Sequence, residues 1–343
     1  MNIVVLAGGL SPERDVSLSG AALACNTLLS SGHKAVLVDL FFGLPTLPPD
    51  IYSVFDAAKP VPPYRVSRTE PDLAAIAATR KTGYDEKIGL NVLELCRACD
   101  IVYMALHGDV GENGMLQRLF DAEGIRYTGS GAEGCRLAMD KWASKRIFNE
   151  TGLSTPFGIR LKRGEPCPEL ELPCVVKPNS GGSSIGISIV REPDELEAAL
   201  DLAFEKEDEI IIEQYIKGRE FSCGVLDGAA LPLIELIPHQ GFYDYANKYQ
   251  PNAVTEQTPA HVDAAATLRA QELSVKAFHA LQLAVYARMD LIMTEAGEWF
   301  LLEANTLPGM TPTSLLPQEA AAVGIDFSAL CCKIIALSEE KYR

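Results

Sequence analysis

WFLLEANTLPGMTPTSLL, residues 299–316, begins as an apolar strand and changes character within a few residues. Trp299 to Leu302 have the apolar, partly aromatic composition of a buried β-strand. Glu303 and Asn305 follow, where a core strand would not be expected to carry a charge. A metal ion, a substrate, or a strand end that reaches water would each account for this carboxylate and amide.

A second polar pair precedes this stretch in VYARMDLIMTEAGEWFLLEAN, residues 285–305, which is predicted to be a hairpin turning at residues 295–298. Positions that differ by two lie on one face of a strand, so Arg288 shares a face with Asp290, and Glu303 with Asn305. Any single pair would fit a surface ion pair. Four such groups among apolar strands favour a site, and hard oxygen ligands suit Mg²⁺ with substrate phosphates. We therefore interpret Asp290, Glu303 and Asn305 as magnesium ligands.

A glycine- and serine-rich loop lies in CVVKPNSGGSSIGISIV, residues 174–190, which reads as strand, loop and strand. Its backbone N–H groups and serine hydroxyls could approach phosphate oxygens, and Lys177 adds positive charge. The alternative is a flexible turn without a ligand. IIIEQYIKGREF, residues 210–221, places Glu213 and Glu220 around an apolar strand end, where a backbone edge could bind adenine and a carboxylate the ribose.

Three other motifs compete with this interpretation. GSGAEG, residues 129–134, matches the dinucleotide pattern G-x-G-x-x-G, but it follows a short polar strand in the middle of the chain. GSSIG, residues 182–186, matches the hydrolase pattern G-x-S-x-G, but a strand rather than the required helix follows it. Cys96 and Cys99 form a lone C-x-x-C, for which one helical turn is a sufficient explanation. No P-loop pattern G-x-x-x-x-G-K-[ST] occurs in the chain.

The rest of the chain predicts an α/β opening and a mixed remainder, α+β overall. NIVVLAGG, a helical segment ending on Gly32, and KAVLVDL form a β-loop-α-β unit typical of a parallel sheet. Residues 43–72 read as an irregular excursion, and RLAMDKWASKRIFNETG, residues 136–152, as one helix. With 343 residues, two or three domains are expected.

The overall composition limits the compartments and partners. The net charge of −16 disfavours nucleic acid and anionic membranes as partners. No apolar run is long enough to span a membrane, and MNIVVLAGG lacks a basic leader. Nine scattered cysteines favour reduced thiols. We therefore expect a cytoplasmic protein.

Several of these segments together resemble the D-alanine–D-alanine ligases of the ATP-grasp superfamily over nearly the whole length. The matching segments are GGLSPERDVSLSG, ALHGDVGENG, YTGSG with AMDKWASK, VVKPNSGGSSIG, IIEQYIKGREF, FYDYANKY, ARMDL and LLEANTLPGMTPTSL. The resemblance implies an ATP-grasp fold in three domains: an N-terminal parallel-sheet domain at residues 1–136, a central lid domain at 137–220, and a C-terminal antiparallel-sheet catalytic domain at 221–343.

The same resemblance implies the activity and its cofactors. An ATP-dependent ligase would join two D-alanines through an acyl phosphate for peptidoglycan precursors, using ATP and two Mg²⁺ ions, for which Mn²⁺ can substitute. It also implies a homodimer. The alternatives are a related ATP-grasp ligase with a different second D-amino or D-hydroxy acid, and an ATP-binding protein that has lost catalysis.

The resemblance also implies roles for the residues of this chain that match the motifs of the family. The resemblance assigns contacts with the nucleotide to Lys141, Lys177, Ser184, Glu213, Gln214, Ile216, Glu220 and Lys248. It assigns contacts with the two substrates or the reacting groups to Glu13, His107, Ser183, Tyr249, Arg288, Gly309, Ser314 and Leu315. Lys248 and Tyr249 lie in GFYDYANKYQPNAVTEQTPA, residues 241–260, which would be a lid that excludes water from the acyl phosphate. The resemblance also implies that the tyrosine at position 249 favours an amide product over an ester.

Overall fold

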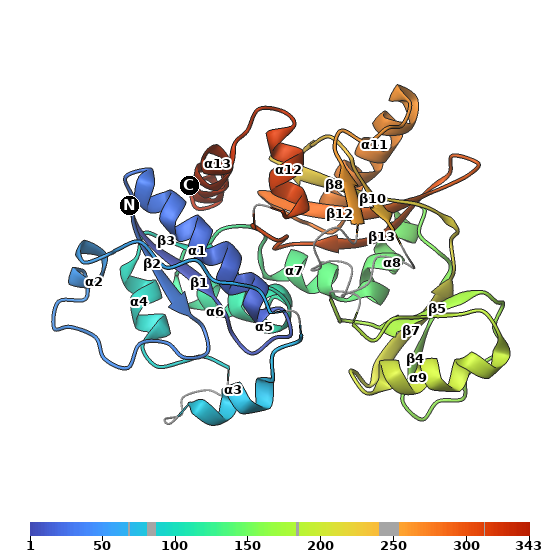
Figure 1. Ribbon diagram of the computed structural model, residues 1–343, viewed down its shortest axis with the longest axis horizontal. Helices are drawn as coiled ribbons and strands as arrows, with labels where there is room; N and C mark the ends of the chain where they lie inside the picture. The colour runs from blue at the N-terminus through green and yellow to red at the C-terminus, as the bar shows by residue number, and fades with distance from the viewer. Residues whose placement is uncertain (68, 81–86, 183–184, 240–253, 312) are drawn as a thin grey trace.

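The part of the chain that the structure describes is organised around three separate β-sheets (Figure 1). The computed structural model describes residues 1–67, 69–80, 87–182, 185–239, 254–311 and 313–343. The first sheet is parallel, and the other two are built from antiparallel pairs. Within the described ranges, no helix is both long and apolar enough to cross a bilayer.

The N-terminal part is a three-stranded parallel sheet in the order β2-β1-β3. Its strands are β1 (Asn2–Ala7), β2 (Lys34–Asp39) and β3 (Ile101–Met104). Its helices are α1 (Arg14–Ser30), α2 (Ser53–Asp56), α3 (Leu73–Thr79), α4 (Val92–Ala98), α5 (Asp109–Glu112) and α6 (Met115–Glu123). The expected β-loop-α-β opening is confirmed, and the described residues between 43 and 72 are irregular apart from the single turn of α2 and a β-bridge at Gly43.

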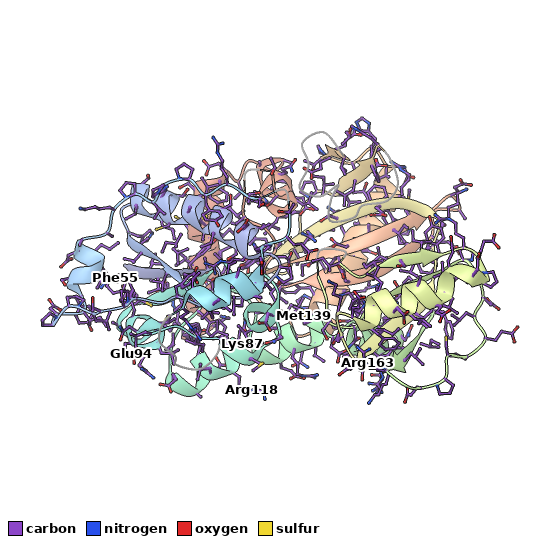
Figure 2. All side chains as sticks on the ribbon, turned by 60° about the horizontal axis from the view of Figure 1, so that its bottom comes forward. Phe55, Lys87, Glu94, Arg118, Met139 and Arg163 are labelled. Carbon is purple, nitrogen blue, oxygen red and sulfur yellow. The ribbon has the colours of Figure 1, made fainter. Side chains whose placement is uncertain are left out.

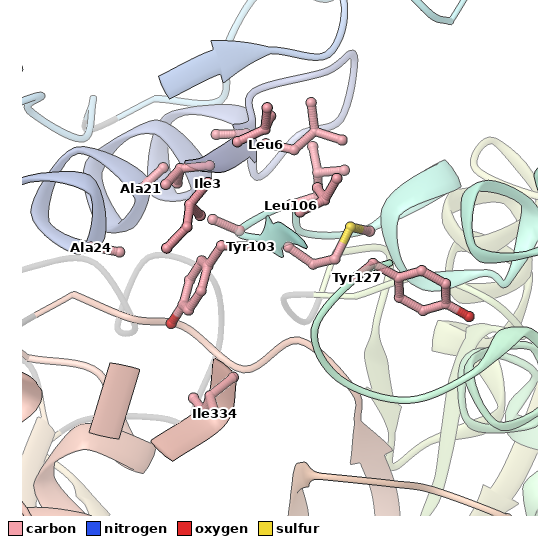
Figure 3. Packing of buried hydrophobic residues seen from close by; sticks show 14 of the residues in the cluster. Ile3, Leu6, Ala21, Ala24, Tyr103, Leu106, Tyr127 and Ile334 are labelled. Atoms are coloured by element: carbon pink, nitrogen blue, oxygen red, sulfur yellow. The ribbon is translucent and has the colours of Figure 1, made fainter. Parts of the chain in front are cut away.

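The core of this part includes the C-terminus of the chain. Figure 3 shows Tyr103 of β3 and Ile3 of β1 packed in the same cluster as Ile334 of α13 (Phe327–Glu340). After Asn2, β1 is apolar and its five residues are buried, as expected of a central strand covered on both faces. The end of the chain therefore stabilises its beginning.

Two short helices, α7 (Ala132–Met139) and α8 (Lys141–Glu150), connect this part to the rest. Met139 lies between the two halves of the molecule in Figure 2. The prediction of one helix over residues 136–152 is wrong, because Asp140 has an extended backbone (φ −82, ψ 97) and caps α8 by accepting a hydrogen bond from the Ala143 N–H at 2.9 Å. The break sets the position of Lys141 as the first residue of α8.

The middle sheet has four strands in the order β4-β7-β5-β6. They are β4 (Gly158–Lys162), β5 (Cys174–Pro178), β6 (Ser188–Val190) and β7 (Glu209–Gln214), with the 3₁₀ turn η1 (Pro193–Glu195) and α9 (Leu196–Phe204) beside them. β5 and β6 pair antiparallel, which confirms the hairpin that carries the glycine-rich loop.

The third sheet carries the polar pairs discussed above. Its strands are β8 (Gly218–Leu226), β9 (Ala229–Ala230), β10 (Ile234–Pro238), β11 (Val254–Gln257), β12 (Tyr286–Thr294) and β13 (Trp299–Asn305). Its helices are α11 (Ala264–Ala280) and α12 (Leu315–Ala321). Ala287, Met289 and Leu291 of β12 are buried in one cluster with the apolar side of α11. By strand alternation, Arg288 and Asp290 face the opposite side.

Candidate active site

A narrow cleft lies where α8, the loop after β5, and β13 meet. Its lining residues are Lys141, Lys177, Pro178, Gly181, Gly182, Ile185, Ile187 and Glu303. The ammonium of Lys141 donates a hydrogen bond to the Gly181 carbonyl and lies 3.4 Å from a Glu303 carboxylate oxygen. The cleft therefore joins the glycine-rich loop to the C-terminal end of β13.

The three predicted metal ligands occupy adjoining positions on β12 and β13. Asp290 lies opposite Glu303, and Arg288 opposite Asn305, with a register shift directly after Asp290. The guanidinium of Arg288 donates to both oxygens of Asp290 at 2.8 Å, and the Asn305 amide donates to Asp290 Oδ2 at 3.1 Å. The pairing brings together the four groups that strand parity predicted.

This donor set fits a magnesium ion by its chemistry. Among the described residues, no group of three or more acidic, histidine or cysteine side chains gathers as a metal centre. Two carboxylates and one amide oxygen instead supply a partial set of hard ligands, of the kind that Mg²⁺ completes with water and phosphate oxygens. Among the described residues, Arg288 lies against Asp290 and Lys141 lies against Glu303.

A buried charge cluster adjoins the cleft through Lys177. Glu213 is 5% exposed, and its two oxygens lie 2.5 Å from Lys177 Nζ and 2.6 Å from Lys145 Nζ. Burial alone would raise the pKa of Glu213, but Lys177 and Lys145 outweigh it and lower this pKa. Burial also lowers the pKa of Lys145 to about 8, against the opposing effect of Glu213. Sequence reasoning missed Lys145, although it lies one helical turn after Lys141.

The neighbouring residues predicted to contact the nucleotide lie where the chain passes from the middle sheet to the third sheet. Gln214 ends β7 with an exposed side chain, Ile216 is buried, and Glu220 lies near the start of β8. The Gln214 backbone N–H already donates a hydrogen bond to the Phe157 carbonyl at 2.8 Å. Contact of these residues with a nucleotide stays a prediction.

The first loop of the chain reaches the glycine-rich loop through Glu13. A Cβ added at Gly108 would lie 3.2 Å from Glu13 Oε2, and a Cβ added at Gly182 would lie 3.1 Å from it. The carboxylate of Glu13 is therefore held between two glycines from distant segments. Ser183 and Ser184 follow Gly182 but lie outside the described residues, as do Lys248 and Tyr249.

His107 and Glu112 connect the first sheet to the end of β13. His107 is buried and its Nδ1 donates to the Leu307 carbonyl at 2.8 Å. Glu112 accepts from the backbone N–H of Leu307 at 3.0 Å and of Gly108 at 2.8 Å. Burial raises the pKa of Glu112. Sequence reasoning missed Glu112, and its place four residues after Gly108 was the available signal.

The segment after β13 forms a tight turn before α12. Ser314 is the N-cap residue of α12, whose first residue is Leu315, so the predicted helix start is confirmed. Ser314 Oγ accepts from the Thr311 N–H at 3.0 Å and would lie 2.6 Å from a Cβ at Gly309. A second buried acid that sequence reasoning missed, Glu319, lies further along α12.

Comparisons with known proteins agree over the whole chain. The family models described as D-ala D-ala ligase N-terminus and D-ala D-ala ligase C-terminus match residues 2–130 and 162–336. The chain is 41% identical to the D-alanine–D-alanine ligase of Pediococcus pentosaceus, covering 100% of this chain and 99% of that protein. It is 39% identical to the enzyme of Lacticaseibacillus casei, covering 98% and 95%. A crystal structure of D-alanine–D-alanine ligase from Bacillus anthracis complexed with ATP superimposes with a TM-score of 0.77 and 31% identity, covering 99% and 98%.

Proposed function

Because this chain belongs to the D-alanine–D-alanine ligase family, we propose that it joins two D-alanines into D-alanyl-D-alanine at the expense of ATP, for peptidoglycan precursors. The observation that carries the proposal is the cleft between the glycine-rich loop and β13. There Lys141 touches both the loop and Glu303, next to the Asp290 and Asn305 oxygens. A triphosphate bound with a divalent cation needs this combination of backbone donors, lysines and hard oxygens.

The first chemical step makes the carboxylate of the first D-alanine reactive. A carboxylate oxygen attacks the γ-phosphorus of ATP, the bond to the bridging oxygen breaks, and an acyl phosphate and ADP form. Asp290, Glu303 and Asn305 would hold Mg²⁺, which when bound neutralises the phosphate charge. Lys141 and Lys177 supply positive charge to the phosphates, and Glu13 binds the ammonium of the first D-alanine.

The second step forms the amide. The amine of the second D-alanine, after losing a proton, attacks the acyl carbonyl, and phosphate leaves when the tetrahedral intermediate collapses. Arg288 and the Gly309 N–H would stabilise the oxyanion, and one such donor is commonly worth about 3 kcal/mol of barrier. Ser314 and the Leu315 N–H would bind the second carboxylate. His107 would lie near the first carboxylate, held in place by its hydrogen bond to Leu307.

Lid closure belongs to the same proposal. Ser183 and Tyr249 would extend a hydrogen-bonded link from Glu13 over the bound substrates, while Ser184 and Lys248 contact phosphates. The position of Glu13 beside Gly182, the residue before Ser183, supports this link. Closure would keep water from the acyl phosphate.

The assembly and location are also proposals. We propose a homodimer in the cytoplasm, with domains at 1–136, 137–220 and 221–343; the limits at 136 and 220 fall within α7 and β8. Mn²⁺ would replace Mg²⁺ in the reaction, since both prefer oxygen ligands. Sedimentation velocity at micromolar protein would test the dimer, and a single monomer peak would contradict it.

The decisive experiment is a substrate panel. Phosphate release and dipeptide formation are measured with D-alanine, L-alanine, D-serine and D-lactate, each with ATP and Mg²⁺. We expect D-alanine alone to give the dipeptide with one phosphate per amide bond. ATP hydrolysis without product would support a protein that has lost ligation, and product with another acceptor would reassign the second substrate.

A further inference from the structure

Glu319 is a carboxyl group that the reaction scheme above leaves unused. It lies in α12, its side chain is 0% exposed, and neither carboxyl oxygen has a hydrogen bond of good geometry among the described residues, although the Ser222 hydroxyl and the Gly224 amide lie close enough to lower its pKa. A buried ionisable group without a partner costs several kcal/mol if it is charged, so such groups are rare unless they have a task.

The fold makes room for this carboxyl at one position of β8. A Cβ added at Gly224 would lie 2.4 Å from Glu319 Oε2, and 2.6 Å from a methyl carbon of Leu316. Glycine is the residue that leaves this space empty. The carboxyl of Glu319 therefore occupies the place that a side chain at position 224 would take.

That place lies directly beside Arg288. β8 and β12 are antiparallel, and their register sets Gly224 opposite Arg288 and Ser222 opposite Asp290. Side chains at directly opposed positions lie on the same face, with Cβ atoms about 5 Å apart. Glu319, which comes from helix α12, thus takes the place of an acidic side chain at position 224 of β8 as a neighbour of Arg288. The charges of Glu319 and Arg288 interact. A further acid, Glu256, also interacts with Arg288 and accepts a hydrogen bond from Gln318 of α12 at 2.6 Å.

Arg288 and a divalent cation compete for the same carboxylate. In this structure both oxygens of Asp290 accept hydrogen bonds from Arg288, which is the geometry of a closed ion pair. If Asp290 is to ligate a cation, this ion pair has to loosen. When a partly buried guanidinium separates from one carboxylate, it needs another negative group nearby. Glu319 lies close to Arg288 on the side of β8.

We propose that Glu319 is a positioning residue that receives the charge of Arg288 when Asp290 turns to the divalent cation. The proposal rests on the function proposed above, because it takes Asp290 as a metal ligand. It assigns α12 two tasks: its first residues lie at the acceptor end of the site, and its second turn supplies the acid that keeps Arg288 on the sheet.

Metal binding without turnover tests this role. Protein saturated with a non-hydrolysable ATP analogue is titrated with Mg²⁺ by calorimetry. The variant Glu319→Gln keeps the shape of the side chain but not its charge, so Arg288 should remain paired with Asp290. We expect the Mg²⁺ concentration at half-saturation, the midpoint, to rise about tenfold, which is the effect of losing one charged partner. Binding of the analogue without metal should not change. Glu340→Gln, an exposed glutamate on α13, controls for the loss of one negative charge and should match the wild type.

A second variant separates positioning from folding. Gly224→Asp combined with Glu319→Ala moves the carboxylate from α12 to the strand position opposite Arg288, and we expect it to restore the midpoint to within about threefold of the wild type. Equal midpoints for the wild type and Glu319→Gln would overturn the role of Glu319. No Mg²⁺ binding by the wild type would instead overturn the metal site. If D-alanine gave no dipeptide in the substrate panel, the substrate assignment would be overturned. The comparison of Mg²⁺ midpoints between the wild type and Glu319→Gln could still be interpreted.

Discussion

The pH dependence of stability provides a direct test of how Glu319 is buried. Burial raises the pKa of Glu319 from its ordinary value of 4.5 to about 7, and Ser222, Arg288 and the Gly224 amide offset this only in part. Asp290 adds to the rise. The folded protein therefore binds this proton more tightly than the unfolded chain does.

The sign and size of the effect follow from linkage. Below about pH 4.5 Glu319 is protonated in both states, and its contribution to stability is fully present. As the pH rises towards and through 7, the unfolded chain ionises first and that contribution is lost. The interval between 4.5 and about 7, at about 1.4 kcal/mol per pH unit, gives a loss of roughly 3 kcal/mol by pH 8.

The variant Glu319→Gln lacks this titration. We expect the difference in unfolding free energy, variant minus wild type, to grow by roughly 3 kcal/mol in favour of the variant between pH 4.5 and pH 8. Urea unfolding of the ligand-free proteins, followed by circular dichroism at four pH values, measures it. Taking the difference removes all other titrating groups and the fixed cost of the buried amide. A difference that stays flat with pH would refute the raised pKa that burial gives this acid.

Other substitutions probe the remaining parts of the site. Glu303→Gln should lower turnover on the order of a hundredfold with an unchanged melting temperature, and full activity would contradict its role as a ligand. Lys145→Met removes one of two cations from the buried Glu213 and should cost about 3 kcal/mol in urea unfolding, whereas an unchanged midpoint would mean that the ion pair contributes nothing. Gly224→Ala places a Cβ 2.4 Å from a carboxylate oxygen and should cost about 2 kcal/mol by overpacking. Gly131→Ala meets open space and is its control, so equal losses in both would argue against a specific clash.

The sheet that carries the site could be predicted from sequence because it follows strand alternation. Arg288 and Asp290 differ by two, as do Glu303 and Asn305, and the observed register places the two pairs opposite each other. The hairpin turn at residues 295–298 would by itself pair Asp290 with Leu302, and the register shift next to Asp290 sets it opposite Glu303 instead. Such local rules carried most of the fold, including the glycine-rich hairpin and the opening β-loop-α-β unit.

The break between α7 and α8 was missed because apolar periodicity continues across it. The signal was Asp140, a good N-cap residue, three positions before the Ala143 N–H that it binds. Asn179 strengthens the break, since its side chain accepts from the Trp142 N–H at 2.9 Å and donates to Asp140 at 3.0 Å. Local propensity could not distinguish one continuous helix from two helices that meet at Asp140. The tertiary contact with Asn179 favours the two helices.

Glu319 could not be predicted for a related reason. In a short amphipathic helix an isolated glutamate ordinarily faces water, and only Gly224, on a strand far away in the sequence, makes its burial possible. The same holds for Glu112, whose partners Gly108 and Leu307 come from two separate segments. Local patterns indicated the proposed ligands, whereas the charges behind them depend on tertiary packing.

The two carboxylates of the predicted metal site are already neutralised by the protein itself. A guanidinium nitrogen of Arg288 lies 2.8 Å from Asp290 Oδ2, and Lys141 Nζ lies 3.4 Å from Glu303 Oε2. A divalent cation alone would have to displace both positive groups and would bind weakly. A triphosphate that arrives with the cation gives Lys141 a new partner, and Glu319 gives one to Arg288. We therefore expect metal and nucleotide to bind together, with the affinity for each raised by the other, because each removes a competitor of the other.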